Sequence, residues 1–245
     1  MLLFFLPSAC ITLFCLLLLL ALKTLFKNVL PSYSNIIIAH SAFIALCVGI
    51  YVENLLISYF HDPVALWVGR ILGLCGLILF IKVFCQGIAL EDIGICRPSP
   101  KEIPMTILLF FIVSAVTWYA VHRLSPHKEF STNTFLFMLL IAGLGEELVF
   151  RGLMPSLLMV RVGPGRQLEK INRILVFVIP TAFFSLIHAW RFMGGYFYFS
   201  GYTFCMIGVG ACAFMYLRLK TNSLINSMLV HNLLNAGTVV VLSIS

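Results

Sequence analysis

Long uninterrupted apolar runs constrain this chain more than any other feature. The runs from Ile11 to Leu22, Ile103 to Val121 and Ile174 to Ile187 reach or approach the roughly 20 apolar residues that cross about 30 Å of hydrocarbon. The sequence is 61% hydrophobic and only 10% charged, whereas an average soluble domain carries about 25% charged residues. Since a water-soluble fold cannot bury that much apolar surface, the sequence predicts an integral membrane protein.

Eight apolar segments with short polar connections between them are expected to cross the bilayer as helices. They cover residues 2–22, 36–58, 64–87, 103–122, 134–160, 174–192, 199–217 and 222–243. The first segment has no basic start and is long enough to span, so we interpret it as a retained helix rather than a signal peptide. The predicted fold class is an all-α polytopic membrane protein with about eight transmembrane helices.

The lysines and arginines predict the orientation of these helices. Ten of them lie in the odd-numbered loops and three in the even-numbered loops, which places the odd loops in the cytoplasm and both termini outside. The net charge of +7 does not indicate a nucleic-acid partner, because the basic residues flank apolar spans instead of forming one face. We expect a multi-pass protein of the bacterial inner membrane.

A polar, proline-rich stretch divides the chain into two parts. Pro98, Pro100 and Pro104 mark the clearest break in composition. Three leading helices occupy residues 1–99, and a five-helix remainder occupies residues 100–245.

The first part of the chain contains few polar residues. His40, Glu53, Arg70 and Lys82 are its notable ones, and we attribute them to structural packing or to snorkelling toward the interface. The eight cysteines of the whole chain form no CxxC pair, so neither a disulfide framework nor a metal cluster is indicated.

Charged residues inside the fifth predicted span call for an explanation. Glu146, Glu147 and Arg151 fall within six residues of an apolar segment, and each such group costs at least about 2.5 kcal/mol near a helix centre on insertion scales. Glu147 and Arg151 are four residues apart, in the favourable order for an ion pair. Glu146 is rotated about 100° from Glu147, so it is free to act as a general base; a purely structural charge cluster is the alternative.

Polar residues in two further spans support a catalytic interpretation. In the sixth span Phe184 and His188 share one helical face, and in the eighth span His231 and Asn235 do the same. One histidine on an apolar helix is usually a packed core residue. An acid, two imidazoles and an amide on three apolar helices instead provide a base, proton carriers and a hydrogen-bond donor for an oxyanion.

These residues resemble the motifs of a known family, the CAAX-protease and bacteriocin-processing (CPBP, or Abi) family of intramembrane glutamic proteases. The family patterns EExxxR, FxxxH and HxxxN look like the segments 146–151, 184–188 and 231–235, in the same order and in apolar spans. The resemblance covers roughly residues 100–243. It implies that residues 100–245 form the intramembrane protease core.

The resemblance also implies a role for each motif residue. Glu146 and His188 would activate a water molecule, and His231 and Asn235 would stabilise the tetrahedral oxyanion. Glu147, Arg151 and Phe184 would support the site. The implied reaction is endoproteolysis of a membrane-associated peptide or protein, either prenylated or carrying a sorting signal, without a cofactor.

Two alternatives remain at this stage. Glu146, His188 and His231 could be the three ligands of a catalytic zinc ion, although the chain has no HExxH motif. The chain could also be a transporter or a non-catalytic membrane scaffold with a polar centre, but no paired Gly- or Pro-interrupted spans indicate two symmetric halves.

Other intramembrane protease chemistries fit less well. Presenilin-type enzymes need two intramembrane aspartates, and the only aspartates, Asp62 and Asp92, lie in predicted loops. A serine enzyme using Ser200 and His231 would leave Glu146 and His188 without a role.

Overall fold

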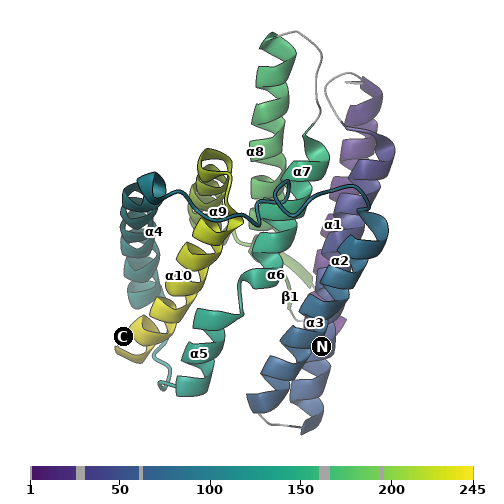
Figure 1. The fold of residues 1–245 in the computed structure, drawn as a ribbon. Helices are drawn as coiled ribbons and strands as arrows, with labels where there is room; N and C mark the ends of the chain where they lie inside the picture. Colours follow the sequence, from purple (N-terminus) through teal and green to yellow (C-terminus); the bar gives the residue numbers. More distant parts are fainter. Residues whose placement is uncertain (1, 26–30, 61–62, 160–165, 194–195, 245) are drawn as a thin grey trace.

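The computed structural model describes the chain except for residues 1, 26–30, 61–62, 160–165, 194–195 and 245. Long helices dominate the described part and run up and down the molecule (Figure 1). They are α1 (Leu2–Leu25), α2 (Tyr33–Phe60), α3 (Pro63–Phe84), α4 (Ile103–Leu124), α8 (Arg166–Ala189), α9 (Gly201–Thr221) and α10 (Leu224–Ile244). A short 3-10 helix, η1 (Pro100–Glu102), precedes α4.

Six of the described helices are long and apolar enough to cross a bilayer, namely α2, α3, α4, α8, α9 and α10. Helix α1 is 24 residues long, and its stretch Cys10–Thr24 is apolar as well. Large apolar side chains stay exposed on these helices, for example Leu79 at 61% and Phe111 at 62%. Such side chains are suited to contact hydrocarbon. The structure therefore confirms an all-α polytopic membrane protein.

The predicted fifth span, 134–160, is wrong as one continuous helix. The structure divides it into α5 (Thr132–Leu140), α6 (Leu144–Glu147), the π-helix η2 (Leu148–Leu153) and α7 (Met154–Leu158). A turn at residues 141–143 separates α5 from α6, where Gly143 and Gly145 lower the helix propensity. Irregular backbone at membrane depth must be buried in protein. This segment accordingly runs through the centre of the molecule, between α10 and the α2–α3 pair (Figure 1).

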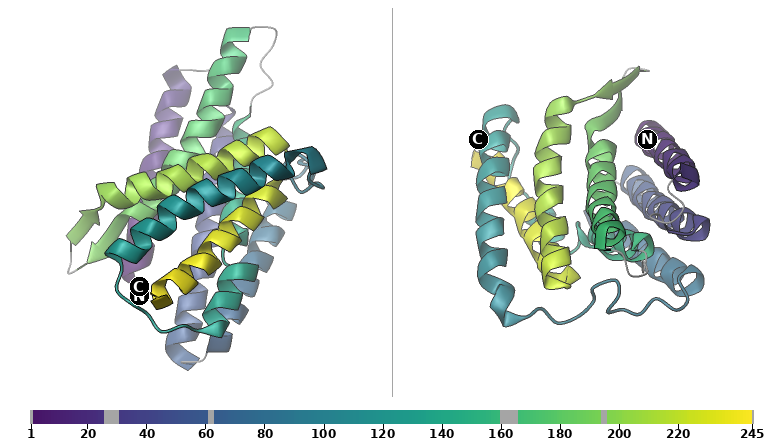
Figure 2. Two further views of the ribbon diagram at one scale, coloured as in Figure 1. Left: turned by 90° about the vertical axis from the view of Figure 1, so that its left-hand side faces the viewer. Right: turned by 90° about the horizontal axis from the view of Figure 1, so that it is seen from above.

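The predicted sixth span, 174–192, also ends differently. Helix α8 stops at Ala189, and the chain continues into β1 (Trp190–Met193), which pairs antiparallel with β2 (Tyr196–Phe199). Aromatic residues favour strands over helix, and this segment is rich in them. The hairpin projects at one side of the molecule (Figure 2), and its base is closed by a hydrogen bond from Ser200 N to Ala189 O (2.9 Å).

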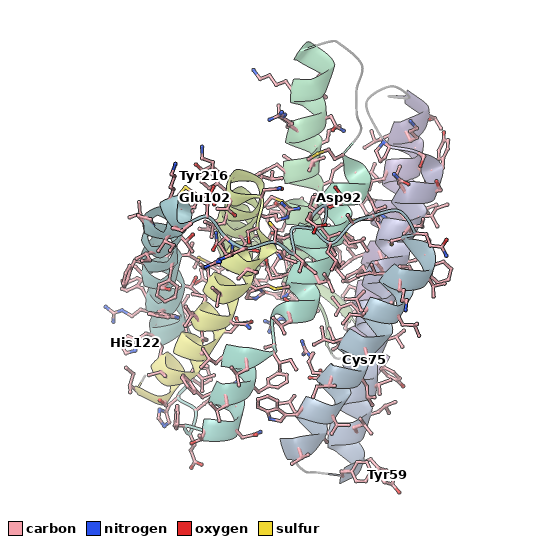
Figure 3. The ribbon with its side chains drawn as sticks, in the orientation of Figure 1. Tyr59, Cys75, Asp92, Glu102, His122 and Tyr216 are labelled. Carbon is pink, nitrogen blue, oxygen red and sulfur yellow. The ribbon has the colours of Figure 1, made fainter. Side chains whose placement is uncertain are left out.

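The polar stretch between the two predicted parts is fixed against the second part. It crosses the front of the molecule from α3 to α4, and Figure 3 shows Asp92 in the middle of this crossing. Arg218 of α9 donates to the Asp92 carbonyl (2.8 Å), and the Leu224 amide of α10 donates to the Gly94 carbonyl (2.7 Å). The connection therefore joins the ends of α9 and α10 instead of hanging free as a linker.

Candidate active site

Glu147 is the most deeply buried acid of the charged cluster. Its side chain is 0% exposed, and its Oε1 lies 3.2 Å from Nη1 of Arg151. This is the ion pair that the spacing predicted. The same oxygen lies 2.8 Å from Nδ1 of His231 on α10. Because a carboxylate only accepts hydrogen bonds, the Nδ1 of His231 is the donor, and the Nε2 atom is left to face the site.

Arg151 is held between aromatic rings. It is 1% exposed, and its guanidinium carbon lies 4.1 Å from the ring centroid of Phe184 and 5.4 Å from that of Phe214. A desolvated guanidinium over an aromatic face is stabilised by about 2 kcal/mol, so the two rings help to offset its burial. Phe214, on α9, also stacks on His231 at 5.0 Å. The sequence analysis selected Phe184 but missed Phe214, since one aromatic residue in an apolar helix carries no motif signal.

Glu146 points away from its neighbour, as the helical repeat predicts. Its side chain is 21% exposed, and its Oε2 lies 3.9 Å from Nε2 of His231. His231 therefore lies between the two acids, with one ring nitrogen directed at each. The better exposed acid is the one that water can reach.

His188 joins the cluster through Phe184. Its Nδ1 lies 2.8 Å from the Phe184 carbonyl oxygen, which makes Nδ1 the donor and leaves Nε2 available. The ring of Phe184 lies 4.4 Å from that of His188 and 6.2 Å from that of His231. Asn235 lies on α10 one turn after His231 and is half-buried. Glu146 and His231 therefore lie directly beside each other. His188 is linked to His231 through the ring of Phe184, which contacts both histidines.

Two residues that the sequence analysis did not select fix the backbone beside His231. Oδ1 of the buried Asn232 accepts a hydrogen bond from the Gly143 amide (3.0 Å). A Cβ atom on Gly143 would lie 2.6 Å from that oxygen and 3.0 Å from Nδ1 of His231, so any larger residue would displace Asn232 or the His231 ring. The adjacency of Asn232 to His231 and the break in helix propensity at Gly143 were signals in the sequence.

The positions of the possible metal ligands are relevant to the alternative of a zinc site. Within the described ranges, no three His, Cys, Asp or Glu side chains are grouped so that they could hold a metal ion. Nδ1 of His231 is already bonded to Glu147, so only its Nε2 remains to serve as a ligand.

The comparisons with known proteins agree with the motifs. Residues 128–237 match the model of a family described as type II CAAX prenyl endopeptidase Rce1-like. All seven motif residues lie in this region. No curated protein matches the chain, and no solved structure does. Residues 128–237 of this integral membrane protein are therefore similar to the Rce1-like type II CAAX prenyl endopeptidases, which are CAAX proteases.

Proposed function

We propose that this protein is an intramembrane endopeptidase in which Glu146 acts as the general base. The observation that supports this proposal is the contrast between the two neighbouring acids. Glu147 is fully buried, ion-paired with Arg151 and hydrogen-bonded to His231, whereas Glu146 is partly exposed and faces Nε2 of His231 at 3.9 Å. This contrast supports Glu146, and not Glu147, as the group that takes a proton from water.

In the proposed reaction, Glu146 accepts a proton from a water molecule, and the resulting hydroxide adds to the carbonyl carbon of the peptide bond. His188 orients that water through Nε2, because its Nδ1 is bonded to the Phe184 carbonyl. When the tetrahedral intermediate collapses, the C–N bond breaks. The proton passes from Glu146 to the leaving nitrogen, and the second proton of the water stays on the new carboxyl group. The products are a carboxylic acid and an amine, which exchange a proton to give a carboxylate and an ammonium group.

The oxyanion of the intermediate needs hydrogen-bond donors. His231, in its protonated form, would donate from Nε2, and Asn235 would donate from its side-chain amide one helical turn away. Two carboxylates lie beside the His231 ring, Glu147 Oε1 at 2.8 Å from Nδ1 and Glu146 Oε2 at 3.9 Å from Nε2. Preorganised donors of this kind contribute more in a site from which water is excluded.

The proposed substrate is a membrane-associated peptide or protein. The family description indicates a prenylated C-terminal CAAX segment, and a peptide that carries a sorting signal is the second class. The proposed location is the bacterial inner membrane, with both termini outside. A prenyl chain would hold the substrate in the bilayer, where the long apolar helices of this protein also lie.

The proposal can be tested with the purified full-length protein in lipid nanodiscs. The probe is a farnesylated CAAX peptide with a fluorophore and a quencher on opposite sides of the expected cleavage site, alongside the same peptide without the farnesyl group. Wild-type protein should cleave the farnesylated probe, and Glu146→Gln should not. Glu91→Gln, in the exposed α3–α4 connection, is the matched control. Equal cleavage by wild type and Glu146→Gln would overturn the general-base assignment.

A further inference from the structure

A buried ion pair joins two of the leading helices, outside the region that matches the family. Arg70 of α3 donates from Nε to Glu53 Oε2 (2.6 Å) and from Nη2 to Glu53 Oε1 (3.2 Å). The Glu53 side chain is 6% exposed and that of Arg70 is 11% exposed. Of the two explanations that the sequence analysis offered, packing and snorkelling, the buried pair agrees with packing.

Close packing of the two helices makes this pair possible. A Cβ atom on Gly69 would lie 2.4 Å from Glu53 Cα, and one on Gly73 would lie 3.0 Å from Gly49 Cα. Small residues let apolar helices approach closely in a membrane. The backbone of α2 is therefore near enough for both carboxylate oxygens of Glu53 to reach the guanidinium.

Arg70 makes its third hydrogen bond to a residue outside the leading helices. Its Nη1 donates to the carbonyl oxygen of Ala142 (2.7 Å), in the turn between α5 and α6. The amide of the same peptide unit belongs to Gly143 and donates to Asn232 Oδ1 (3.0 Å). One peptide group is thus held from both sides, by α3 through its carbonyl and by α10 through its amide.

This peptide group is directly connected to the catalytic residues. The Gly143 carbonyl accepts the backbone amide of Glu147 (2.9 Å) and so starts the helix that carries Glu146. Asn232 is the neighbour of His231, and a Cβ atom on Gly143 would lie 3.0 Å from Nδ1 of the His231 ring. Any movement of the peptide group would change the distance between Glu146 and His231.

Helix α3 also holds the segment before the turn. Trp67 Nε1 donates to Asn133 Oδ1 (2.9 Å) near the start of α5. The ring of Trp67 packs edge-on to Phe137 at 5.6 Å, and the Arg70 guanidinium lies 5.3 Å from the centroid of Phe137. Both α5 and the turn that follows it are therefore located relative to α3.

We infer that Arg70, oriented by Glu53, is a positioning residue that fixes the Ala142–Gly143 peptide group and through it sets Glu146 against His231. The ion pair alone would satisfy two buried charges, but it would not require a third bond to a backbone carbonyl of another segment. The carbonyl at a helix break needs a donor at membrane depth, and Arg70 supplies it. The inference rests on the proposed function, since it assumes that Glu146 and His231 carry the chemistry. It gives two of the three leading helices, α2 and α3, a role in positioning the proposed catalytic residues.

The decisive variant exchanges the two charges. Glu53→Arg combined with Arg70→Glu keeps an ion pair between α2 and α3 but places at position 70 a carboxylate, which cannot donate to the Ala142 carbonyl. Arg70→Lys keeps a charged donor at that position. Arg123→Gln, an exposed arginine at the end of α4, is the control for loss of a cation elsewhere.

Three measurements are made on each protein in nanodiscs. They are kcat and KM on the farnesylated CAAX probe, the temperature of thermal unfolding, and amide hydrogen exchange of peptides that cover residues 141–147. For the exchanged pair we expect kcat to fall about 100-fold, because a misplacement near 1 Å costs about that much. We expect KM within about twofold and an unfolding temperature close to wild type, because the pair is preserved. Exchange at 141–147 should become faster, whereas Arg70→Lys should recover part of kcat and Arg123→Gln should match wild type.

The outcomes separate this inference from the proposed function. If the exchanged pair keeps wild-type kcat and wild-type exchange at 141–147, Arg70 is not a positioning residue. An unfolding temperature that falls in parallel with kcat, with faster exchange throughout the protein, would show a merely structural pair and would also overturn the inference. If wild-type protein fails to cleave the probe, the proposed substrate is wrong, and the exchange at 141–147 still decides the role of Arg70.

Discussion

His231 donates from Nδ1 to Oε1 of Glu147 across 2.8 Å. The bond fixes the orientation of the imidazole, and Nε2 consequently faces Glu146 at 3.9 Å. The two neighbouring acids thus have different surroundings, although they are adjacent in sequence. Glu147 fixes the His231 ring through Nδ1, and Glu146 lies on the side toward which Nε2 points.

Replacing Glu146 by Gln should abolish turnover while leaving the fold intact. Gln keeps the size and much of the hydrogen bonding of Glu146 but cannot accept the proton of water. We expect kcat to fall by at least about 10²–10⁴, the usual contribution of a general base. The unfolding temperature should change little, because the side chain is 21% exposed. Turnover of the purified variant on the farnesylated probe measures the effect, and near-normal kcat would show that another group is the base.

Replacing Arg151 by Met should destabilise the protein strongly. It leaves Glu147, which is 0% exposed, without its guanidinium, and breaking a buried pair in this way typically costs about 3–5 kcal/mol. Adding Glu147→Gln should restore part of the stability, because the unpaired charge is then removed. Thermal unfolding of the two single variants and the double variant forms a double-mutant cycle. Purely additive losses would show that the two side chains do not interact.

The long helices and the three motifs could be predicted because their signals are local. An apolar run long enough to cross a bilayer has few alternatives to a helix, and residues four apart share a helical face whatever surrounds them. The pairing of Glu147 with Arg151 is such a local contact. So is the divergence of Glu146 from Glu147.

The break in the fifth span and the Arg70 contact could not be predicted in the same way. Ile141 to Gly145 contains two glycines, which are common in transmembrane helices, so the sequence did not distinguish a weak helix from a turn. Glu53 and Arg70 carry opposite charges within apolar spans, and this was a signal for a buried pair. The hydrogen bond from Arg70 to Ala142 depends on how separate helices pack against each other. Patterns of neighbouring residues in the sequence do not predict such packing.

Replacing Gly143 by Ala should lower kcat with little loss of overall stability. The new Cβ atom would lie 2.6 Å from Asn232 Oδ1 and 3.0 Å from His231 Nδ1, so Asn232 or the His231 ring must move. We expect a fall of about 10²-fold, the effect of misplacing a catalytic group by about 1 Å. Gly76→Ala is the matched control, since its Cβ atom would meet nothing within 4 Å. Steady-state kinetics on the farnesylated probe compares them, and equal kcat for both variants would mean that Gly143 does not constrain the site.

Asn235 distinguishes the glutamic mechanism from a zinc mechanism. It follows His231 by one turn on α10, where an amide can donate a hydrogen bond to the oxyanion. Truncation to Ala should therefore reduce kcat by about 10²–10³, the usual effect of losing one oxyanion donor. KM should change little, because the oxyanion forms only as the transition state is approached.

In the zinc mechanism the metal would polarise the substrate carbonyl, and Asn235 would matter little. Glu146, His188 and His231 would be the ligands, and chelation would abolish cleavage. Elemental analysis of active protein, together with Asn235→Ala kinetics before and after chelator treatment, decides between the two mechanisms. Stoichiometric zinc, chelator-sensitive turnover and an unaffected Asn235→Ala variant would together overturn the assignment of Glu146 as a metal-free base. Turnover that persists in the chelator and falls with Asn235→Ala would support it, because the oxyanion would then depend on the amide and not on a metal.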